Sequence, residues 1–229
     1  GFTIREFNGE TSVNPWSAFV WSRAYTASSK TVSDLMVSND DPRLDYYTYD
    51  LWDIDDEESK WGGQSYNPGD EAIARTTSEF AYPAWYDLGS QPIHLFSKHE
   101  LYFILAEVQL RSGKDATKAF QTAVETSVSE TLSWFDDGAS ASDYAKSLGG
   151  PTLQKLFEQK YLAQSVDEQI ETYNDFRRLK AMGENYITLT NPLNTQSGIN
   201  RYPERLPYGN SGVVGNPYVK EAYGDGSYI

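Results

Sequence analysis

A helix-forming segment that begins at Ser97 constrains the fold of this 229-residue chain more than any other feature. Ser97 and Glu100 have the S-x-x-E spacing of a capping box, in which each side chain satisfies a free backbone N–H group at the helix start. The next apolar residues recur at the i, i+3, i+4, i+7 spacing of one buried helix face. They are Leu101, Ile104, Leu105 and Val108. Since Gly113 stands where a helix commonly ends, we expect a helix from Ser97 to about Gly113.

A second helix is expected directly after the first, with Asp115 as a possible cap. Its predicted buried face consists of Ala116, Ala119, Phe120, Ala123 and Val124. The spacing of small residues around Phe120 matches part of the tetratricopeptide repeat pattern, in which small side chains let two helices approach closely. The match covers one helix, and no second copy follows at the repeat period. Residues 97 to about 131 are therefore predicted to form an antiparallel helix pair.

Further helices are predicted on both sides of this pair from hydrophobic periodicity and from Gly and Pro residues that interrupt helices. They span Thr31–Val37, Ser142–Leu148, Pro151–Gln164 and a segment from a cap at Asp167 to Gly183. The expected buried positions are Leu153, Leu156, Phe157 and Tyr161 in the third of these, and Ile170, Tyr173, Phe176 and Leu179 in the fourth. Leu44–Trp52 has the composition of a strand.

The pattern therefore predicts a mostly α fold with long irregular loops. We expect tetratricopeptide-like helix pairs, together with a loop-rich aromatic region that contains a short β-hairpin. The predicted division is residues 1–96 as a loop-rich, aromatic-rich ligand-binding region and 97–229 as a helical-pair region with wrapping carboxy-terminal loops.

Charge and composition exclude several kinds of partner. The formal net charge is -14, with 19 Lys and Arg against 33 Asp and Glu. Binding to nucleic acid or directly to an anionic lipid surface is not expected, because both need clustered cations. The chain has no cysteine, so it offers neither a disulfide nor a thiolate ligand nor a lipidation site within these residues. The opening at Gly1, without a signal peptide, predicts a fragment or processed form of a longer protein.

Aromatic residues make up 14% of the chain, and their placement suggests a binding role. Five of the six tryptophans precede residue 97, at positions 16, 21, 52, 61 and 85. Sugar rings stack their C–H faces on aromatic rings, while nearby amides and acids bond the hydroxyls. The candidate ligand-binding residues are Trp52, Trp61, Gln64, Tyr66, Asn67, Tyr82 and Trp85. The alternative is that these aromatic side chains pack an irregular region with few helices of its own.

Metal binding and catalysis are less favoured. Asp53, Asp55 and Asp56 are the only Ca²⁺ candidate, but an EF-hand loop would need Gly where Glu58 stands, so a solvated acidic loop is the preferred interpretation. Neighbouring acids such as Asp136 and Asp137 carry almost no information about glycoside hydrolysis, because a chain with 33 acids always offers pairs. We expect neither an enzyme nor a cofactor.

The two histidines and a pair of arginines are also assigned structural roles. His94 and His99 are five residues apart across a helix start, so they are not expected to share one helix face, and surface or capping roles are predicted. Arg177 and Arg178 are expected to pack their stems and pair with nearby acids.

Several stretches, taken in order, resemble the SusD/RagB family. They are DPR at 41–43, HELYFILAEVQLRSG at 99–113, LQKLFEQKYLAQSVDEQIETYNDFRRLKAMG at 153–183 and RYPERLPYGNSGVVGNPYV at 201–219. The resemblance covers roughly residues 30–220. Phe176 stands where the family more often has Trp, and Gly209 where it often has Pro.

This resemblance implies a surface-exposed lipoprotein of the outer membrane of Bacteroidota. Such proteins capture glycans, or in some cases peptides, for a SusC-like TonB-dependent transporter. The implied function is non-catalytic nutrient capture, with oligosaccharide or peptide as ligand. Membrane attachment would come only through an amino-terminal lipid anchor absent from this chain, together with the amino-terminal half of the fold. Two other readings remain: a helical-repeat adaptor for proteins with no small ligand, and a glycoside hydrolase.

Overall fold

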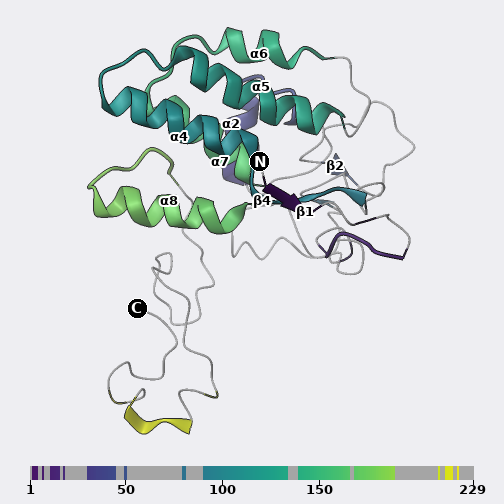
Figure 1. The fold of residues 1–229 in the computed structure, drawn as a ribbon, viewed down its shortest axis with the longest axis vertical. Helices are drawn as coiled ribbons and strands as arrows, with labels where there is room; N and C mark the ends of the chain where they lie inside the picture. Colours follow the sequence, from purple (N-terminus) through teal and green to yellow (C-terminus); the bar gives the residue numbers. More distant parts are fainter. Residues whose placement is uncertain are drawn as a thin grey trace.

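The computed structural model describes residues 2–4, 7, 11–15, 18, 30–44, 49–50, 79–80, 90–133, 139–165, 168–188, 211, 215–218 and 221. The helices in these ranges are α2 (Lys30–Ser38), α4 (Lys98–Arg111), α5 (Thr117–Ser133), α6 (Ala141–Ser147), α7 (Leu153–Gln164) and α8 (Gln169–Ala181) (Figure 1). The strands are β1 (Phe2–Ile4), β2 (Tyr49–Asp50), β3 (Glu79–Phe80) and β4 (Ile93–Phe96). The mostly helical class predicted from the sequence is confirmed. No described helix has the length and apolar character needed to cross a bilayer.

The predicted helix pair is present as α4 and α5, and its ends follow the sequence signals. The Ser97 Oγ accepts a hydrogen bond from the backbone N–H of Glu100 at 2.9 Å, which caps α4. Gly113 ends the helix with φ of 69°, a left-handed conformation that glycine adopts without a Cβ clash. The Asp115 carboxylate then accepts from the N–H of Thr117 at 2.9 Å at the start of α5.

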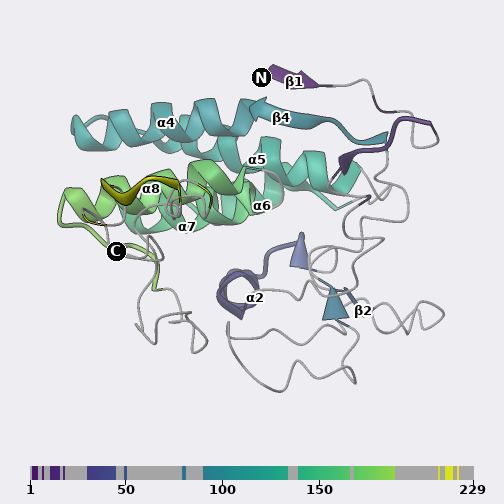
Figure 2. The ribbon, with the colours of Figure 1, turned by 90° about the horizontal axis from the view of Figure 1, so that it is seen from below.

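The core lies between α4, α5, α6 and α7. All five predicted apolar positions of the second helix are buried: Ala116, Ala119, Phe120, Ala123 and Val124. The rings of Phe103 and Phe120 meet edge to face, with centroids 6.4 Å apart. From α7, Leu156 and Phe157 complete this cluster, as predicted. Figure 2 shows these helices lying side by side, with α2 on another side of α7.

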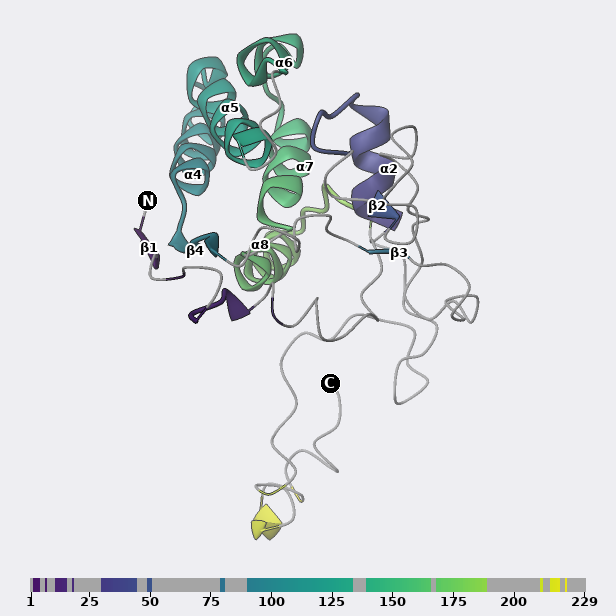
Figure 3. The same ribbon diagram turned by 90° about the vertical axis from the view of Figure 1, so that its right-hand side faces the viewer.

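One prediction for α4 is wrong. The four residues expected to line the core are exposed: Leu101 by 50%, Ile104 by 39%, Leu105 by 42% and Val108 by 56%. The helix instead buries the side that carries Phe103 and Ala106. Packing is the reason: α4 contacts α5 and α7, the ring of Phe103 meets Phe120 of α5, and α4 itself lies at the edge of the helices (Figure 3). Periodicity identifies an apolar face, but it does not say which of two apolar faces meets the core.

The predictions for α8 are only partly correct. The helix ends as expected before Gly183, which has φ of 74°. Its amino-terminal cap position is Glu168 rather than Asp167, and the Glu168 side chain makes no capping hydrogen bond. Of the four expected core residues only Leu179 is buried, while Ile170 is 75% exposed. Little of α8 is enclosed because, among the described helices, it packs chiefly on α7.

Two small antiparallel pairings lie outside the helices. β1 pairs with β4, with Ile4 opposite Ile93, and β2 pairs with β3, with Tyr49 opposite Phe80. The strand predicted within Leu44–Trp52 is therefore confirmed for Tyr49–Asp50.

Candidate functional site

The predicted ligand-binding residues lie outside the part of the chain that the structure describes. These are Trp52, Trp61, Gln64, Tyr66, Asn67, Tyr82 and Trp85, and the same holds for the Ca²⁺ candidates Asp53, Asp55 and Asp56. Their roles stay predictions. Among the described residues, no three His, Asp or Glu side chains are grouped to hold a metal ion.

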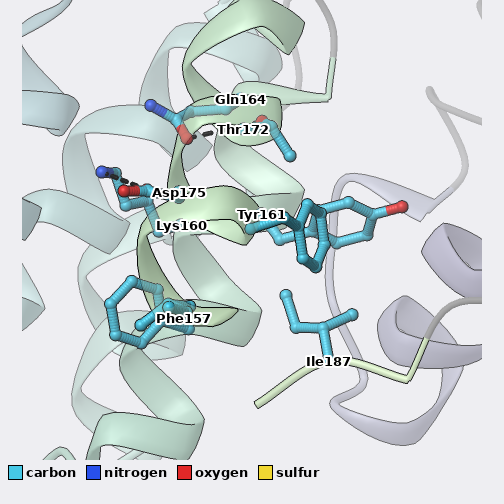
Figure 4. Close-up of a pocket in the computed structure, with 9 residues that line it drawn as sticks. Phe157, Lys160, Tyr161, Gln164, Thr172, Asp175 and Ile187 are labelled. Atoms are coloured by element: carbon cyan, nitrogen blue, oxygen red, sulfur yellow. Dashed lines mark hydrogen bonds and ion pairs between the residues drawn. The ribbon is translucent and has the colours of Figure 1, made fainter. Parts of the chain in front are cut away.

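The described part does contain a hollow between α7 and α8, shown in Figure 4. Its empty volume is about 230 Å³. The lining residues are Phe157, Lys160, Tyr161, Gln164, Thr172, Asp175, Phe176, Leu179 and Ile187. The rings of Tyr161 and Phe176 meet edge to face at 5.8 Å. The volume of about 230 Å³ includes open solvent, and the enclosed space is only about 10 Å³, so this hollow has room for about one water molecule and not for an oligosaccharide.

An ion pair between described residues of this hollow joins the two helices. The Lys160 Nζ donates to the Asp175 Oδ2 at 2.5 Å, with the lysine side chain 6% exposed and the aspartate 17%. The ammonium group of Lys160 is paired with a carboxylate, so this lysine does not serve as a free nucleophile. Sequence reasoning had singled out neither residue, because nothing in the chain marks them as partners before α7 and α8 are packed.

Arg178 ties α8 to α4. Its guanidinium donates to both carboxylate oxygens of Glu107, at 2.7 and 2.9 Å, and to Asp175 at 2.8 Å. Arg111 adds a 2.7 Å bond to Glu107. Burial alone would raise the pKa of Glu107, but the hydrogen bonds from the two arginines outweigh it and lower that pKa. The local pairing expected for Arg178 is confirmed, and Arg177 lies over the ring of Tyr173 at 5.7 Å.

The pKa of Glu100 is shifted in the opposite direction to that of Glu107. Desolvation by burial, followed by repulsion from Glu168, raises the pKa of Glu100 to about 7. Within the described residues its Oε2 has no hydrogen-bond partner. The second half of the predicted capping box is therefore wrong: the Ser97 N–H donates to Glu168 Oε1 at 3.1 Å instead of to Glu100. The fold brings Glu168 to this helix end from 71 residues away.

His99 is buried, His94 is half-buried, and the two lie close together, which corrects the expectation of surface roles. Their ring centroids are 6.0 Å apart. His94 Nε2 lies 2.9 Å from Glu130 Oε1, and His99 Nε2 lies 2.8 Å from Glu168 Oε2. The spacing argument considered one helix face, whereas His94 belongs to β4 and His99 to α4. These contacts join β4 to α5 and the start of α4 to the start of α8.

Residues of two family-like motifs meet in a buried polar network. Arg43 of the DPR stretch is fully buried and forms an ion pair with Asp41 at 2.6 Å. It also donates to Ser127 of α5 at 2.9 Å and to Gln159 of α7 at 3.0 Å. The Tyr144 hydroxyl of α6 donates to Asp41 at 3.0 Å. Because the buried pair of Asp41 and Arg43 contacts α5, α6 and α7, these residues hold the fold together and do not face a ligand.

Comparison with known proteins gives a consistent result. The profile of a SusD-like family, described as starch-binding and associating with the outer membrane, matches residues 4–209. A SusD/RagB family protein from Bacteroides thetaiotaomicron VPI-5482 is 30% identical, with a TM-score of 0.77. That alignment covers 98% of this chain and 52% of the solved chain. A SusD homolog from Bacteroides fragilis NCTC 9343 is 19% identical with a TM-score of 0.71, and 97% of this chain and 55% of that chain are covered.

This chain thus spans about half the length of the solved structures it matches. No curated protein matches it.

Proposed function

This chain belongs to the SusD-like family, and from that premise we propose that it binds glycans at the bacterial outer membrane without cleaving them. The observation that carries the proposal is the family match over residues 4–209, since the matched family is described as starch-binding and associating with the outer membrane. An oligosaccharide is preferred over a peptide as ligand because of the aromatic composition of residues 1–96.

The proposed binding site is the aromatic region that precedes the helix pair. Trp61 and Trp85 would offer flat apolar faces to sugar rings, and Gln64 and Asn67 would bond the hydroxyls. No covalent step is needed for such binding. Arg43, which precedes this region in the chain, is anchored to α5 and α7.

A binding role also agrees with the state of the carboxylates that the structure describes. Glu107 and Glu184 are engaged by arginines, and their pKa values are lowered. A general acid for glycoside hydrolysis needs a raised pKa and access to the scissile bond. Glu100 has the raised pKa, but only 5% of the residue is exposed, which makes it unsuited to reach a sugar.

The proposed partner is a SusC-like TonB-dependent transporter, to which the bound oligosaccharide would be handed. In this proposal the longer protein is a surface lipoprotein held in the outer membrane by an amino-terminal lipid anchor. These two statements rest on the family alone, whose description names the outer membrane.

Tryptophan fluorescence during titration with malto-oligosaccharides, other glycans and short peptides tests the binding role. We expect a saturable change with at least one glycan. Trp61→Ala and Trp85→Ala should each weaken that binding about tenfold, because one stacked aromatic ring contributes roughly 0.5–1.5 kcal/mol beyond its buried area, and the lost burial adds to this. Trp134→Ala is the matched control, because Trp134 is the one tryptophan outside residues 1–96.

The rival functions give different results in the same set of experiments. Unchanged affinity in both variants, together with a large loss of melting temperature, would assign these side chains to packing. Capture of a protein but no glycan would favour the adaptor. Shortened oligosaccharides after prolonged incubation would show a hydrolase.

A further inference from the structure

The buried carboxyl group of Glu100 lies near α7 and α8, in surroundings that disfavour its charge. It stands in the first turn of α4, and only 5% of the residue is exposed. Its Oε2 has no hydrogen-bond partner among the described residues. The backbone N–H of Ser97, which a capping box would offer to this carboxyl group, donates to Glu168 instead. A buried carboxylate that lacks donors is costly, so this position favours the protonated carboxyl group.

The charged groups around Glu100 come from several elements. From the start of α8 and its first turns, the groups that act on it are the acids Glu168, Glu171 and Asp175. From α7, Lys160 opposes them, but its ammonium group already pairs with one of these acids. From α5, Glu130 Oε1 lies 2.9 Å from His94 Nε2, and its Oε2 lies 3.9 Å from His99 Nδ1. Ionised Glu100 therefore adds a negative charge where acids already outnumber bases.

Two contacts join the start of α4 to the start of α8, and both use the Glu168 carboxylate. The Ser97 N–H donates to Oε1 at 3.1 Å, and His99 Nε2 lies 2.8 Å from Oε2. A charge on Glu100, which follows His99 directly in the chain, repels this same carboxylate. The junction between the two helices is therefore sensitive to whether Glu100 holds a proton.

Helix α8 is the element that can yield at this junction. Helix α4 is held along its inner side by α5 and α7, whereas α8 packs chiefly on α7 among the described helices. Of the residues of α8, all of which are described, only Leu179 is buried, and the Glu168 side chain makes no capping hydrogen bond. The far end of α8 is held more firmly, because Arg178 donates to both carboxylate oxygens of Glu107 on α4. In Figure 1 and Figure 3, α8 lies at the edge of the helices, away from α5 and α6.

We propose that the contact of Ser97 and His99 with Glu168 is a proton-controlled latch between α4 and α8. The latch is closed while Glu100 holds a proton. When Glu100 ionises, the first turn of α8 moves away from α4, while the far end of α8 stays bound. This latch is independent of any ligand and of the proposed function.

The direction of the pH effect follows from the closed state. Burial, followed by repulsion from Glu168, raises the pKa of Glu100 from 4.5 to about 7. An acid whose pKa is raised in the closed state releases its proton more readily once the latch opens. The closed form therefore loses stability as pH rises from about 4.5 to 7, and the loss is complete above that range.

Thiol labelling of the full product of the gene that encodes this chain tests the latch, because these 229 residues contain no cysteine. Thr172→Cys places a thiol on the side of α8 that lines the hollow with α7, and Ile170→Cys is an exposed reference on the same helix. Peptide mass spectrometry measures the rate of maleimide modification at each position. The ratio of the two rates at one pH cancels the pH dependence of the thiolate. We expect this ratio to rise about tenfold or more between about pH 5.5 and 8, and adding Glu100→Gln should abolish the rise.

Two controls separate the latch from a general loss of structure. Glu125→Gln removes an exposed acid of α5 and should leave the rise unchanged. Leu179→Cys reports on the far end of α8 and should stay protected at every pH. A ratio that does not change with pH, or a rise that persists with Glu100→Gln, overturns the latch. So does an equal rise at position 179, which would mean that the whole helix detaches or the protein unfolds.

Hydrogen exchange in the unsubstituted protein gives a second readout that needs no introduced cysteine. The backbone N–H groups of Glu171 and Thr172 donate to the Glu168 carbonyl at 3.1 and 3.2 Å. At the far end, the N–H of Met182 donates to the Arg178 carbonyl at 3.1 Å. After correction for the intrinsic exchange rate, protection at the first pair should fall about tenfold over the same pH range, while protection at Met182 stays constant. Equal behaviour at the two ends contradicts the latch.

Discussion

Replacing Arg43 with Met should destabilise the protein strongly, because this substitution removes one partner of a buried ion pair. The side chains of Arg43 and Asp41 are 1% and 0% exposed, and their closest oxygen–nitrogen distance is 2.6 Å. Methionine has a similar length and fills much of the space, so little of the effect comes from a cavity. What remains is the Asp41 carboxylate, buried with the Tyr144 hydroxyl and a backbone N–H as its donors.

The size of the effect follows from this geometry. Breaking a buried pair by removing one partner costs about 3–5 kcal/mol in free energy of unfolding. The hydrogen bonds to Ser127 and Gln159 are lost as well, but these two acceptors are neutral and add less. For a chain of this size, we expect a melting temperature about 6–20 °C lower.

Urea unfolding followed by circular dichroism measures this change directly. Lys146→Met is the control: Lys146 and Asp143 are 3.9 Å apart and their side chains are 66% and 79% exposed, so we expect less than about 0.5 kcal/mol. The double variant Asp41→Asn with Arg43→Met should be more stable than Arg43→Met alone, since it leaves no unpaired charge. A loss below about 1 kcal/mol for Arg43→Met would refute the reasoning.

Two further predictions concern Glu100 and a helix-ending glycine. Because the pKa of Glu100 is raised to about 7 in the folded state, its native carboxyl holds a proton that the unfolded chain releases, so this group lowers stability as pH rises from about 4.5 to 7. Glu100→Gln should remove that decrease, so the free energy of unfolding of the variant should gain up to about 3 kcal/mol on that of the unsubstituted protein between pH 5 and 8. Urea unfolding at each pH measures the difference. Stability profiles against pH that run parallel for the two proteins would contradict the prediction. Gly113→Ala should cost about 1 kcal/mol by thermal unfolding, because φ there is +69° although no atom lies within 4 Å of the new Cβ. Gly150→Ala, without a positive φ and with Thr117 Oγ1 at 3.7 Å, should change stability little, and equal costs at the two positions would rule out backbone strain as the cause.

The local signals in the sequence predicted the helices well. The Ser97 cap, the Gly113 end and the buried face of α5 depend on residues within a few positions of each other, and each was confirmed. Such features are encoded by neighbours in the chain, so no knowledge of the tertiary fold is needed. The family resemblance, which spans separate motifs in a fixed order, was confirmed by the match to residues 4–209.

Apart from the cap of α8, which lies one residue beyond the expected Asp167, the failures concern contacts between distant segments. The sequence could not show that Leu101 faces outward while Phe103 faces α5, because both apolar sides of α4 satisfy the helical period. It could not bring His94 and His99 to Glu130 and Glu168, which lie on other elements. For the candidate ligand residues around Trp61 and Trp85, the expectation from the sequence still stands as a prediction.

Sequence by itself determined where the helices begin and end, which residues are apolar, and to which family the chain belongs, because these follow from local spacing and ordered motifs. Only the tertiary structure decided which apolar face is enclosed and which charged groups meet. Arg43 shows why: its partners Ser127 and Gln159 lie 84 and 116 residues away, and only packing of α5 against α7 brings them to one guanidinium.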